Sequence, residues 1–250
     1  MLFGHETISH YSRSNLIIWM SMAFQAGLLN MGGFLACHRF VSHVTGFATF
    51  FGNEVSNLNF NNALGMLVVP GFFLFGAMVS GVLVDLRIKL HKKPRYYISF
   101  GLIFLLLLVV LFGGLAGKFG RFGEPLDQSQ EYALVIFLCF ICGIQNGTIT
   151  TVSQSVVRTT HLTGITTDLG IGLVRIFNKE RLQLHMEGRL NLMRAGIISF
   201  FGFGCIVGGF AFKYFQYLAF LIPVITSGVL FGLMLYYQVI RKPSEGIETI

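Results

Sequence analysis

Two ten-residue stretches of the chain share one pattern of polar residues and hold most of its capacity for chemistry. His43–Gly52 reads His-Val-Thr-Gly-Phe-Ala-Thr-Phe-Phe-Gly, and His161–Gly170 reads His-Leu-Thr-Gly-Ile-Thr-Thr-Asp-Leu-Gly. Imidazole and hydroxyl groups can hydrogen-bond a polar solute. Polar, glycine-containing elements set among apolar segments are typical of places where a membrane-spanning structure is interrupted. The pair therefore predicts the functional centre of the protein.

On a helix, each stretch places small and hydroxyl side chains on one face. Thr45, Thr49 and Gly52 follow an i, i+4, i+7 spacing, and the second copy repeats it. Helices that start near the middle of a bilayer offer free N–H groups to anionic or polar groups. We expect a substrate-binding pocket lined by His43, Thr45, Gly46, Thr49, His161, Thr163, Gly164, Thr167, Asp168, Asn30 and Asn146. The alternative is structural, with small residues that serve only close helix packing.

Three polar residues need a specific account. Asp168 is the one carboxylate within either stretch. At membrane depth it could exchange protons or bind a cation, whereas near the cytoplasmic face it would pair with Arg158 or Arg175. Asn30 and Asn146 stand within long apolar runs, where an amide needs a partner on a neighbouring helix or in the same pocket.

The sequence lacks the usual catalytic patterns. It contains no P-loop, no Gly-x-Ser-x-Gly, no His-Glu-x-x-His and no paired carboxylates within an apolar segment. We therefore expect no enzymatic activity, no catalytic residue, no bound metal and no cofactor. Cys139 and Cys142 form a Cys-x-x-Cys, but they lack neighbouring charges and further ligands and are expected to be apolar fillers. A redox protein that uses these thiols with His43 and His161 is an alternative.

The elements that must hold these residues are membrane-spanning helices. Hydrophobic residues make up 54% of the chain and charged residues 12%, against about 25% charged residues in a soluble protein. Six stretches lack Asp, Glu, Lys and Arg and are long enough to cross about 30 Å of hydrocarbon. They are Asn15–Ala36, Ala63–Val84, Tyr96–Gly117, Tyr132–Thr150, Ala195–Phe212 and Tyr214–Ile240. The composition predicts an all-α polytopic membrane protein with six transmembrane helices.

The basic residues gather in the connections between these stretches and predict the orientation. Arg87–Arg95 and Arg175–Arg194 each carry five Lys or Arg, whereas Asn53–Asn62 carries none. The positive-inside rule places both basic segments in the cytoplasm, together with both termini. We assign the net charge of +7 to orientation and to contact with anionic membrane lipid, and not to nucleic acid. Trp19, the only tryptophan, is expected to be an interfacial anchor.

Further matches extend the two polar stretches into an internal repeat. The matched segments are Gly27–Asn30 with Gly143–Asn146 and Phe75–Gly81 with Phe203–Gly209. They occur in the same order in both halves, and polar residues at fixed places seldom match by chance in apolar sequence. We therefore expect a single membrane domain over residues 1–250, with repeat 1 at about 15–117 and repeat 2 at about 131–238.

Orientation and repeat together predict that the two halves are inverted. Each half has three crossings, an odd number, so the second half starts from the opposite side of the membrane. Phe40–Asn53 would dip in from the outside and Thr159–Val174 from the cytoplasm. The expected fold is six transmembrane helices plus two re-entrant or half-membrane elements in two inverted three-helix repeats. The alternative makes each polar stretch a full crossing in a parallel repeat, but it puts Asn53–Asn62, which has no Lys or Arg, and the basic Arg175–Arg194 on one side.

A family resemblance rests on the same residues. The block Arg158–Gly170, Arg-Thr-Thr-His-Leu-Thr-Gly-Ile-Thr-Thr-Asp-Leu-Gly, resembles the YoaK-type bacterial membrane family, a domain of unknown function. Gly143–Asn146 and His43–Gly46 are also similar to that family's pattern, and the resemblance covers about residues 15–240. Phe47 departs from it, because the family often has Asn after the first Thr-Gly. The resemblance implies a bacterial inner-membrane protein and supplies no substrate or reaction.

These observations favour a small secondary transporter or permease. The two polar elements would meet near the midplane, and alternating access would rock one half against the other. The solute would be small and polar or anionic, while its identity, the coupling ion and the oligomeric state are left open. The main alternative is a non-transporting scaffold, sensor or assembly factor whose repeats only pack helices.

Overall fold

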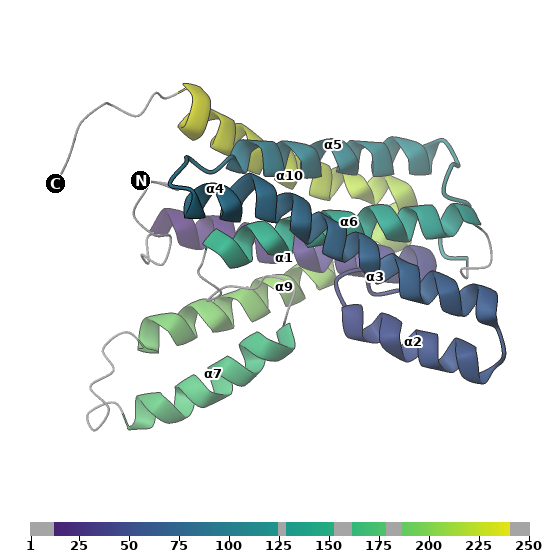
Figure 1. The fold of residues 1–250 in the computed structure, drawn as a ribbon, viewed down its shortest axis with the longest axis horizontal. Helices are drawn as coiled ribbons and strands as arrows, with labels where there is room; N and C mark the ends of the chain where they lie inside the picture. Colours follow the sequence, from purple (N-terminus) through teal and green to yellow (C-terminus); the bar gives the residue numbers. More distant parts are fainter. Residues whose placement is uncertain (1–12, 125–128, 153–161, 179–186, 241–250) are drawn as a thin grey trace.

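The computed structural model describes residues 13–124, 129–152, 162–178 and 187–240, and every regular element within these ranges is helical (Figure 1). Each long helix is an apolar run whose backbone groups bond within the helix, as a bilayer requires. The elements are α1 (Arg13–Cys37), α2 (Val44–Ser56), α3 (Phe60–Ser80), the π-helical turn η1 (Gly81–Asp85), α4 (Leu86–Lys89), α5 (Tyr96–Leu115), α6 (Ser129–Val152), α7 (Leu162–Phe177), α9 (Glu187–Phe215), the 3₁₀ turn η2 (Gln216–Phe220), α10 (Leu221–Leu235) and the π-helical turn η3 (Tyr236–Ile240).

Left-handed residues end four of these helices. His38, Leu58, His91 and Gln216 have φ of 54°, 58°, 54° and 47° and follow α1, α2, α4 and α9. A residue in this conformation cannot continue a right-handed helix, and glycine usually occupies it. None of the four is glycine, so the usual sequence signal for a helix end is missing at each of them.

Among the described residues, five segments are long and apolar enough to cross a membrane. They are Asn15–Cys37, Phe60–Lys89, Tyr96–Leu115, Tyr132–Thr151 and Glu187–Ile240. The prediction of an all-helical polytopic membrane protein is therefore confirmed. The last segment has 54 residues, more than twice the roughly 20 that one crossing needs, and it contains the left-handed Gln216 between α9 and α10.

Glycines bring α1 against α9 and α3 against α6. A Cβ on Gly27 of α1 would overlap the carbonyl oxygen of Phe201, and one on Gly204 of α9 would overlap that of Phe24. The helices α3 and α6 make the same kind of contact, with Gly143 of α6 against the Phe73 carbonyl and Gly76 of α3 against the Phe140 carbonyl. Backbones can approach this closely only where no side chain intervenes, so the glycines fix where the helices cross.

The helices α5 and α10 pack antiparallel through a third reciprocal pair. A Cβ on Gly101 would lie 2.9 Å from the Phe231 ring, and one on Gly228 would lie 3.1 Å from the Phe104 ring. The rings of Phe104 and Phe231 stack with their centroids 6.1 Å apart. Both helices thus place a glycine three residues before a phenylalanine and face each other through it.

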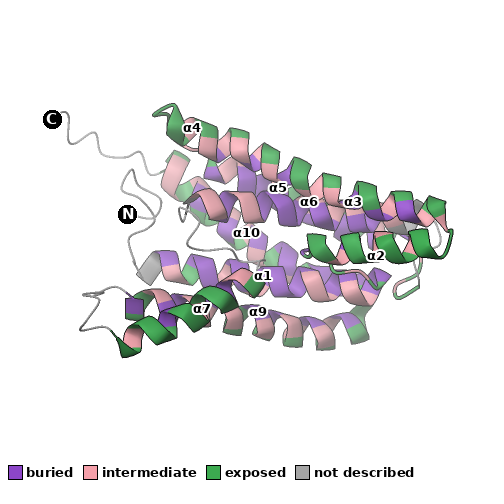
Figure 2. Ribbon diagram, turned by 60° about the horizontal axis from the view of Figure 1, so that its bottom comes forward, coloured by how far each residue is buried: buried purple, intermediate pink, exposed green. Residues whose placement is uncertain are grey.

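The short helices α2 and α7 lie on one side of this bundle and pack mainly on α3 and α9, respectively (Figures 1 and 2). They contain 13 and 16 residues, about 20 and 24 Å at 1.5 Å per residue, and are too short to span 30 Å. Both begin near the middle of the bundle and run toward opposite ends (Figure 1). Their hairpins with α3 and α9 open in opposite directions.

Trp19 does not anchor an interface. Its side chain is 2% exposed, and it belongs to a buried cluster with Ile149, Ile165, Met193 and Ile197. The expectation was wrong because α1 lies against α9, so this turn of α1 faces the protein interior and not the lipid surface.

Candidate functional site

The first polar stretch lies on the start of α2. Phe47 is buried, whereas His43, Thr45 and Thr49 are exposed and Gly46 is half-buried. Phe47 and Thr45 differ by about 200° around a helix with 100° per residue. The hydroxyl side of α2 therefore points away from the helix on which α2 packs.

The second stretch repeats this arrangement on α7. Ile165 is buried, Thr163, Thr167 and Asp168 are exposed, and Gly164 is half-buried. The Thr167 hydroxyl donates to the Thr163 carbonyl oxygen at 3.0 Å, and its counterpart on α2, the Thr49 hydroxyl, donates to the Thr45 carbonyl oxygen at 3.3 Å. His161 lies outside the described residues.

The helix starts give this region its electrostatic character. His43 is the N-terminal flanking residue of α2, and its side chain makes no capping hydrogen bond. The first N–H groups of a helix have no partner within it and carry the positive end of the helix dipole. The hydroxyl of Ser42, the residue before His43, bonds to Asn30 and does not cap the helix. The arrangement can receive anionic or polar groups at the start of α2.

Asn30 holds the segment that leads into α2. Its Oδ1 accepts from the Ser42 hydroxyl at 2.9 Å and from the Ser42 backbone N–H at 3.4 Å. Asn30 thus has a partner on the chain that leads into the polar stretch. Asn146, its match on α6, has a buried Oδ1 that lacks a hydrogen-bond partner in the described part of the chain.

A buried amide network crosses the bundle between α1, α6 and α10. The Gln25 side chain donates to Gln145 Oε1 at 3.3 Å, and Gln145 donates to the Met22 carbonyl oxygen at 2.8 Å. The Thr226 hydroxyl donates to Gln25 Oε1 at 2.9 Å. Polar side chains deep in spanning helices thus satisfy one another. Gln25 and Thr226 were not predicted as part of a network, although a lone glutamine within an apolar run was a usable signal.

Arg39 lies between α1 and α2 and was also missed. Its guanidinium carbon stands 4.3 Å from the centroid of the Phe50 ring, and Nη1 donates to the His38 carbonyl oxygen at 3.0 Å. Desolvation by burial lowers the pKa of Arg39, and the charges of Tyr132 and Glu54 oppose this shift. A cation held over α2 adds to the positive character of this region.

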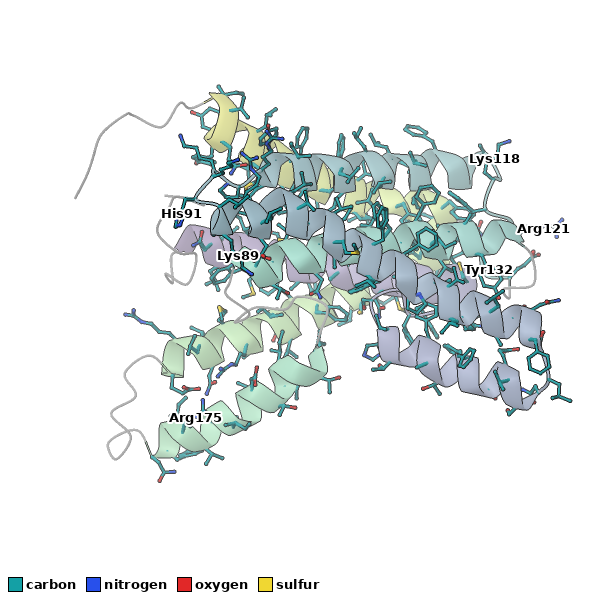
Figure 3. The ribbon with its side chains drawn as sticks, in the orientation of Figure 1. Lys89, His91, Lys118, Arg121, Tyr132 and Arg175 are labelled. Atoms are coloured by element: carbon teal, nitrogen blue, oxygen red, sulfur yellow. The ribbon has the colours of Figure 1, made fainter. Side chains whose placement is uncertain are left out.

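Ion pairs connect the C-terminal part of α7 to α9. We call the end of the bundle that carries Lys89, His91 and Arg175 the basic end; Lys118, Arg121 and Tyr132 mark the opposite end (Figure 3). Arg194 donates to Glu187 at 2.9 Å and to Asn191 Oδ1 at 2.6 Å, and Arg175 lies 3.7 Å from the second Glu187 oxygen.

This cluster bears on the alternative partner for Asp168. Arg175 pairs with Glu187 and not with Asp168, which makes no ion pair within the described residues. Arg158, the other suggested partner, lies outside them. Glu187 was not predicted, although an acidic residue within a basic segment was a usable signal.

The cysteines occupy packing positions. Cys139 and Cys142 are buried and unbonded to each other, and the Cys139 thiol donates to the Val41 carbonyl oxygen at 3.3 Å. The part of the chain that the structure describes contains no group of three or more His, Cys, Asp or Glu side chains able to hold a metal ion.

The long apolar spans define the chain as a polytopic helical membrane protein. A family model described as "Protein of unknown function (DUF1275)" matches residues 18–233, and the chain belongs to this family. The family covers both polar stretches and agrees with the YoaK-type resemblance of the sequence. No curated protein and no solved structure matches the chain.

Proposed function

We propose that this protein is a small secondary transporter or permease of the bacterial inner membrane. Six crossings, with α9 and α10 as separate spans, would carry two half-membrane elements, α2 and α7. The solute would bind where the two half-helices start. The observation that carries the proposal is the arrangement of α2 and α7, which both begin near the middle of the bundle and run to opposite ends (Figure 1).

Reciprocal contacts support two inverted repeats. Gly27 against Phe201 has its counterpart in Gly143 against Phe73, with α1 replaced by α6 and α9 by α3. The pair α5 and α10 supports the same relation, because Gly101 and Gly228 would be equivalent residues. Equivalent helices that cross antiparallel are related by an axis in the membrane plane, which is the relation between inverted repeats.

The charge distribution supports cytoplasmic placement of the basic end. Lys89, His91 and Arg175 lie at that end (Figure 3), and the segments Arg87–Arg95 and Arg175–Arg194 carry ten of the chain's Lys and Arg. Under the positive-inside rule, α7 would then enter the membrane from the cytoplasmic side and α2 from the outer side. Solute could reach the centre from either face by way of one half-helix.

Half-helix starts, hydroxyls and Arg39 together favour a small anion or polar solute. N–H groups at a helix start attract negative charge, and hydroxyls can donate to or accept from the same solute. We assign the binding role to His43, Thr45 and Thr49 from α2 and to Thr163, Thr167 and Asp168 from α7. Asp168 is the group that would carry a proton or a coupling cation.

The test is flux through purified protein in vesicles. We expect labelled acetate, sulfate or phosphate to enter proteoliposomes faster than protein-free vesicles, and glucose serves as the neutral polar probe. Thr45→Val and Thr163→Val should each lower the rate about tenfold, the equivalent of roughly 1.4 kcal/mol of solute binding. Ser56→Ala, at the far end of α2, is the matched control and should leave the rate unchanged. Entry of none of the four probes above the protein-free rate would contradict the proposal.

A non-transporting scaffold is the second candidate. It is favoured by the hydrogen bonds of Thr49 and Thr167 to their own helices, because these hydroxyls are satisfied without a solute. In this case the parent chain, Thr45→Val and Thr163→Val would all show flux at the protein-free level. The same flux measurement therefore separates the two functions.

A further inference from the structure

The connection between α4 and α5 gathers positive charge at the basic end of the bundle (Figure 3). Five Lys and Arg side chains occur within residues 87–95, which we call the basic turn. They are the half-buried Arg87 and the exposed Lys89, Lys92, Lys93 and Arg95. Asp85, just before the turn, pairs with Lys89 at 3.2 Å, and the other four cations make no ion pair within the described residues. The turn thus presents positive charge that the described part of the chain does not neutralise.

Hydrogen bonds hold the basic turn in one compact shape. The Lys92 N–H donates to the Arg87 carbonyl oxygen at 2.7 Å, and the Arg95 N–H donates to the Leu83 carbonyl oxygen at 3.0 Å. The Nε of Arg87 donates across the turn to the Lys93 carbonyl oxygen at 2.8 Å. Because the turn is bonded to the helix before it, its cations are held close together, and little backbone freedom is lost when they bind one anion.

An exposed apolar stripe leads along the same helix to the basic turn. It consists of Phe75, Met78, Val82 and Leu86, which are all exposed. Their spacings of three and four residues put them on one side of the continuous helix formed by α3, η1 and α4, whose exposed face follows the edge of the bundle (Figure 2). From Phe75 to Leu86 the helix rises about 16 Å at 1.5 Å per residue, close to half of a hydrocarbon core of about 30 Å. The stripe therefore has the depth of one leaflet.

The basic turn and the apolar stripe together select the chemistry of their ligand. Cations alone would suit any anion, and an apolar stripe alone would suit any lipid. A phospholipid contacts both at once, because its phosphate lies at the membrane surface and its acyl chain lies in one leaflet. A headgroup with a net negative charge fits better than a zwitterionic one, whose own cation would approach the lysines.

We propose that the basic turn binds the headgroup of an anionic phospholipid from the leaflet at the basic end, with an acyl chain along the apolar stripe. The phosphate oxygens accept hydrogen bonds from the ammonium groups of Lys92 and Lys93 and from the guanidinium of Arg87. The site lies at the membrane surface, away from the starts of α2 and α7, so it does not depend on the proposed transport.

Lipid retention by purified protein tests the site. In nanodiscs of equal parts phosphatidylglycerol and phosphatidylcholine, native mass spectrometry should find phosphatidylglycerol retained in preference by the parent chain. Lys92→Gln with Lys93→Gln should lower this retention about fivefold for each charge removed. Lys118→Gln with Arg121→Gln makes the same change in charge at the opposite end (Figure 3) and should leave retention at the parent level. Equal retention in the two double variants, or no preference in the parent chain, would overturn the inference.

Competition with the parent chain provides a second test that requires no variant. Dihexanoyl-phosphatidylglycerol, a soluble short-chain lipid, should displace the retained phosphatidylglycerol, whereas dihexanoyl-phosphatidylcholine and inorganic phosphate should not. Displacement by inorganic phosphate at the same concentration would identify a site for free anions and overturn the lipid assignment. Equal displacement by both short-chain lipids would show that the headgroup charge is not recognised, and this result would also overturn the inference.

Discussion

The hairpins α2–α3 and α7–α9 start alike and end differently. Each begins with a Thr-Gly element whose second threonine bonds to the first, Thr49 to Thr45 and Thr167 to Thr163. At the far end, Arg175 of α7 pairs with the buried Glu187 of α9, which also pairs with Arg194 of its own helix, whereas Asn59 donates to Glu54 at 3.0 Å where α2 meets α3. The two hairpins thus share the same hydroxyl chemistry where they begin and differ in charge at their outer ends.

The largest expected effect comes from removing the buried carboxylate of the α7–α9 hairpin. Glu187→Gln leaves the guanidinium of Arg194, whose side chain is 12% exposed, without its counter-charge. We expect a loss of about 3–5 kcal/mol in the free energy of unfolding, as for other broken buried pairs. Glu54→Gln in the other hairpin should cost less than about 1 kcal/mol. Denaturation followed by circular dichroism measures both, and equal losses would contradict the comparison.

Adding a methyl group tests how tightly each face of α7 is packed. In Gly172→Ala the new Cβ would overlap Asn191 Oδ1 and lie 2.7 Å from Arg194 Nη1. We expect a loss of about 1–3 kcal/mol in the free energy of unfolding. Gly170→Ala, two residues earlier, meets open space and should stabilise the helix by up to about 1 kcal/mol. Opposite signs in thermal unfolding support the assignment of faces, and equal signs reject it.

The matched asparagines sharpen the comparison between the entries to α2 and α7. Asn30→Leu leaves the buried Ser42 hydroxyl without its acceptor and should cost about 1–3 kcal/mol. Asn146→Leu should cost less, because Asn146 Oδ1 is unpaired in the part of the chain that the structure describes. Hydrogen exchange at the start of α2 should rise in Asn30→Leu. An equal cost in both variants would contradict the difference in hydrogen bonding between Asn30 and Asn146.

The smallest effect is expected at Arg39, which has no counterpart over α7 within the described residues. Arg39→Met removes the cation above the Phe50 ring and should cost about 0.5–1 kcal/mol. A double-mutant cycle with Phe50→Leu isolates this term from the lost hydrogen bond to His38. A coupling of zero between the two substitutions would reject the cation–π contact.

The spanning helices and both Thr-Gly elements could be predicted from the sequence, because apolar runs and polar matches are local features. The match between Gly101 and Gly228 was missed, since a glycine and a phenylalanine are inconspicuous in apolar sequence. The outward direction of Thr45 and Thr163 could not be predicted either. The sequence pattern shows which residues share one face of a helix, but it does not show which face packs against a neighbouring helix. For the same reason Trp19 was expected at the surface and is buried.

The reciprocal glycine contacts also bear on the order in which the protein can be assembled. Gly27 of α1 packs on α9, and Gly76 of α3 packs on α6, so spanning helices of the first half find their closest neighbours in the second. While a ribosome still holds the second half, these glycine faces have no partner. The helices of the first half therefore insert into the bilayer before their packing partners are made, and the two halves fold together after the second half is inserted.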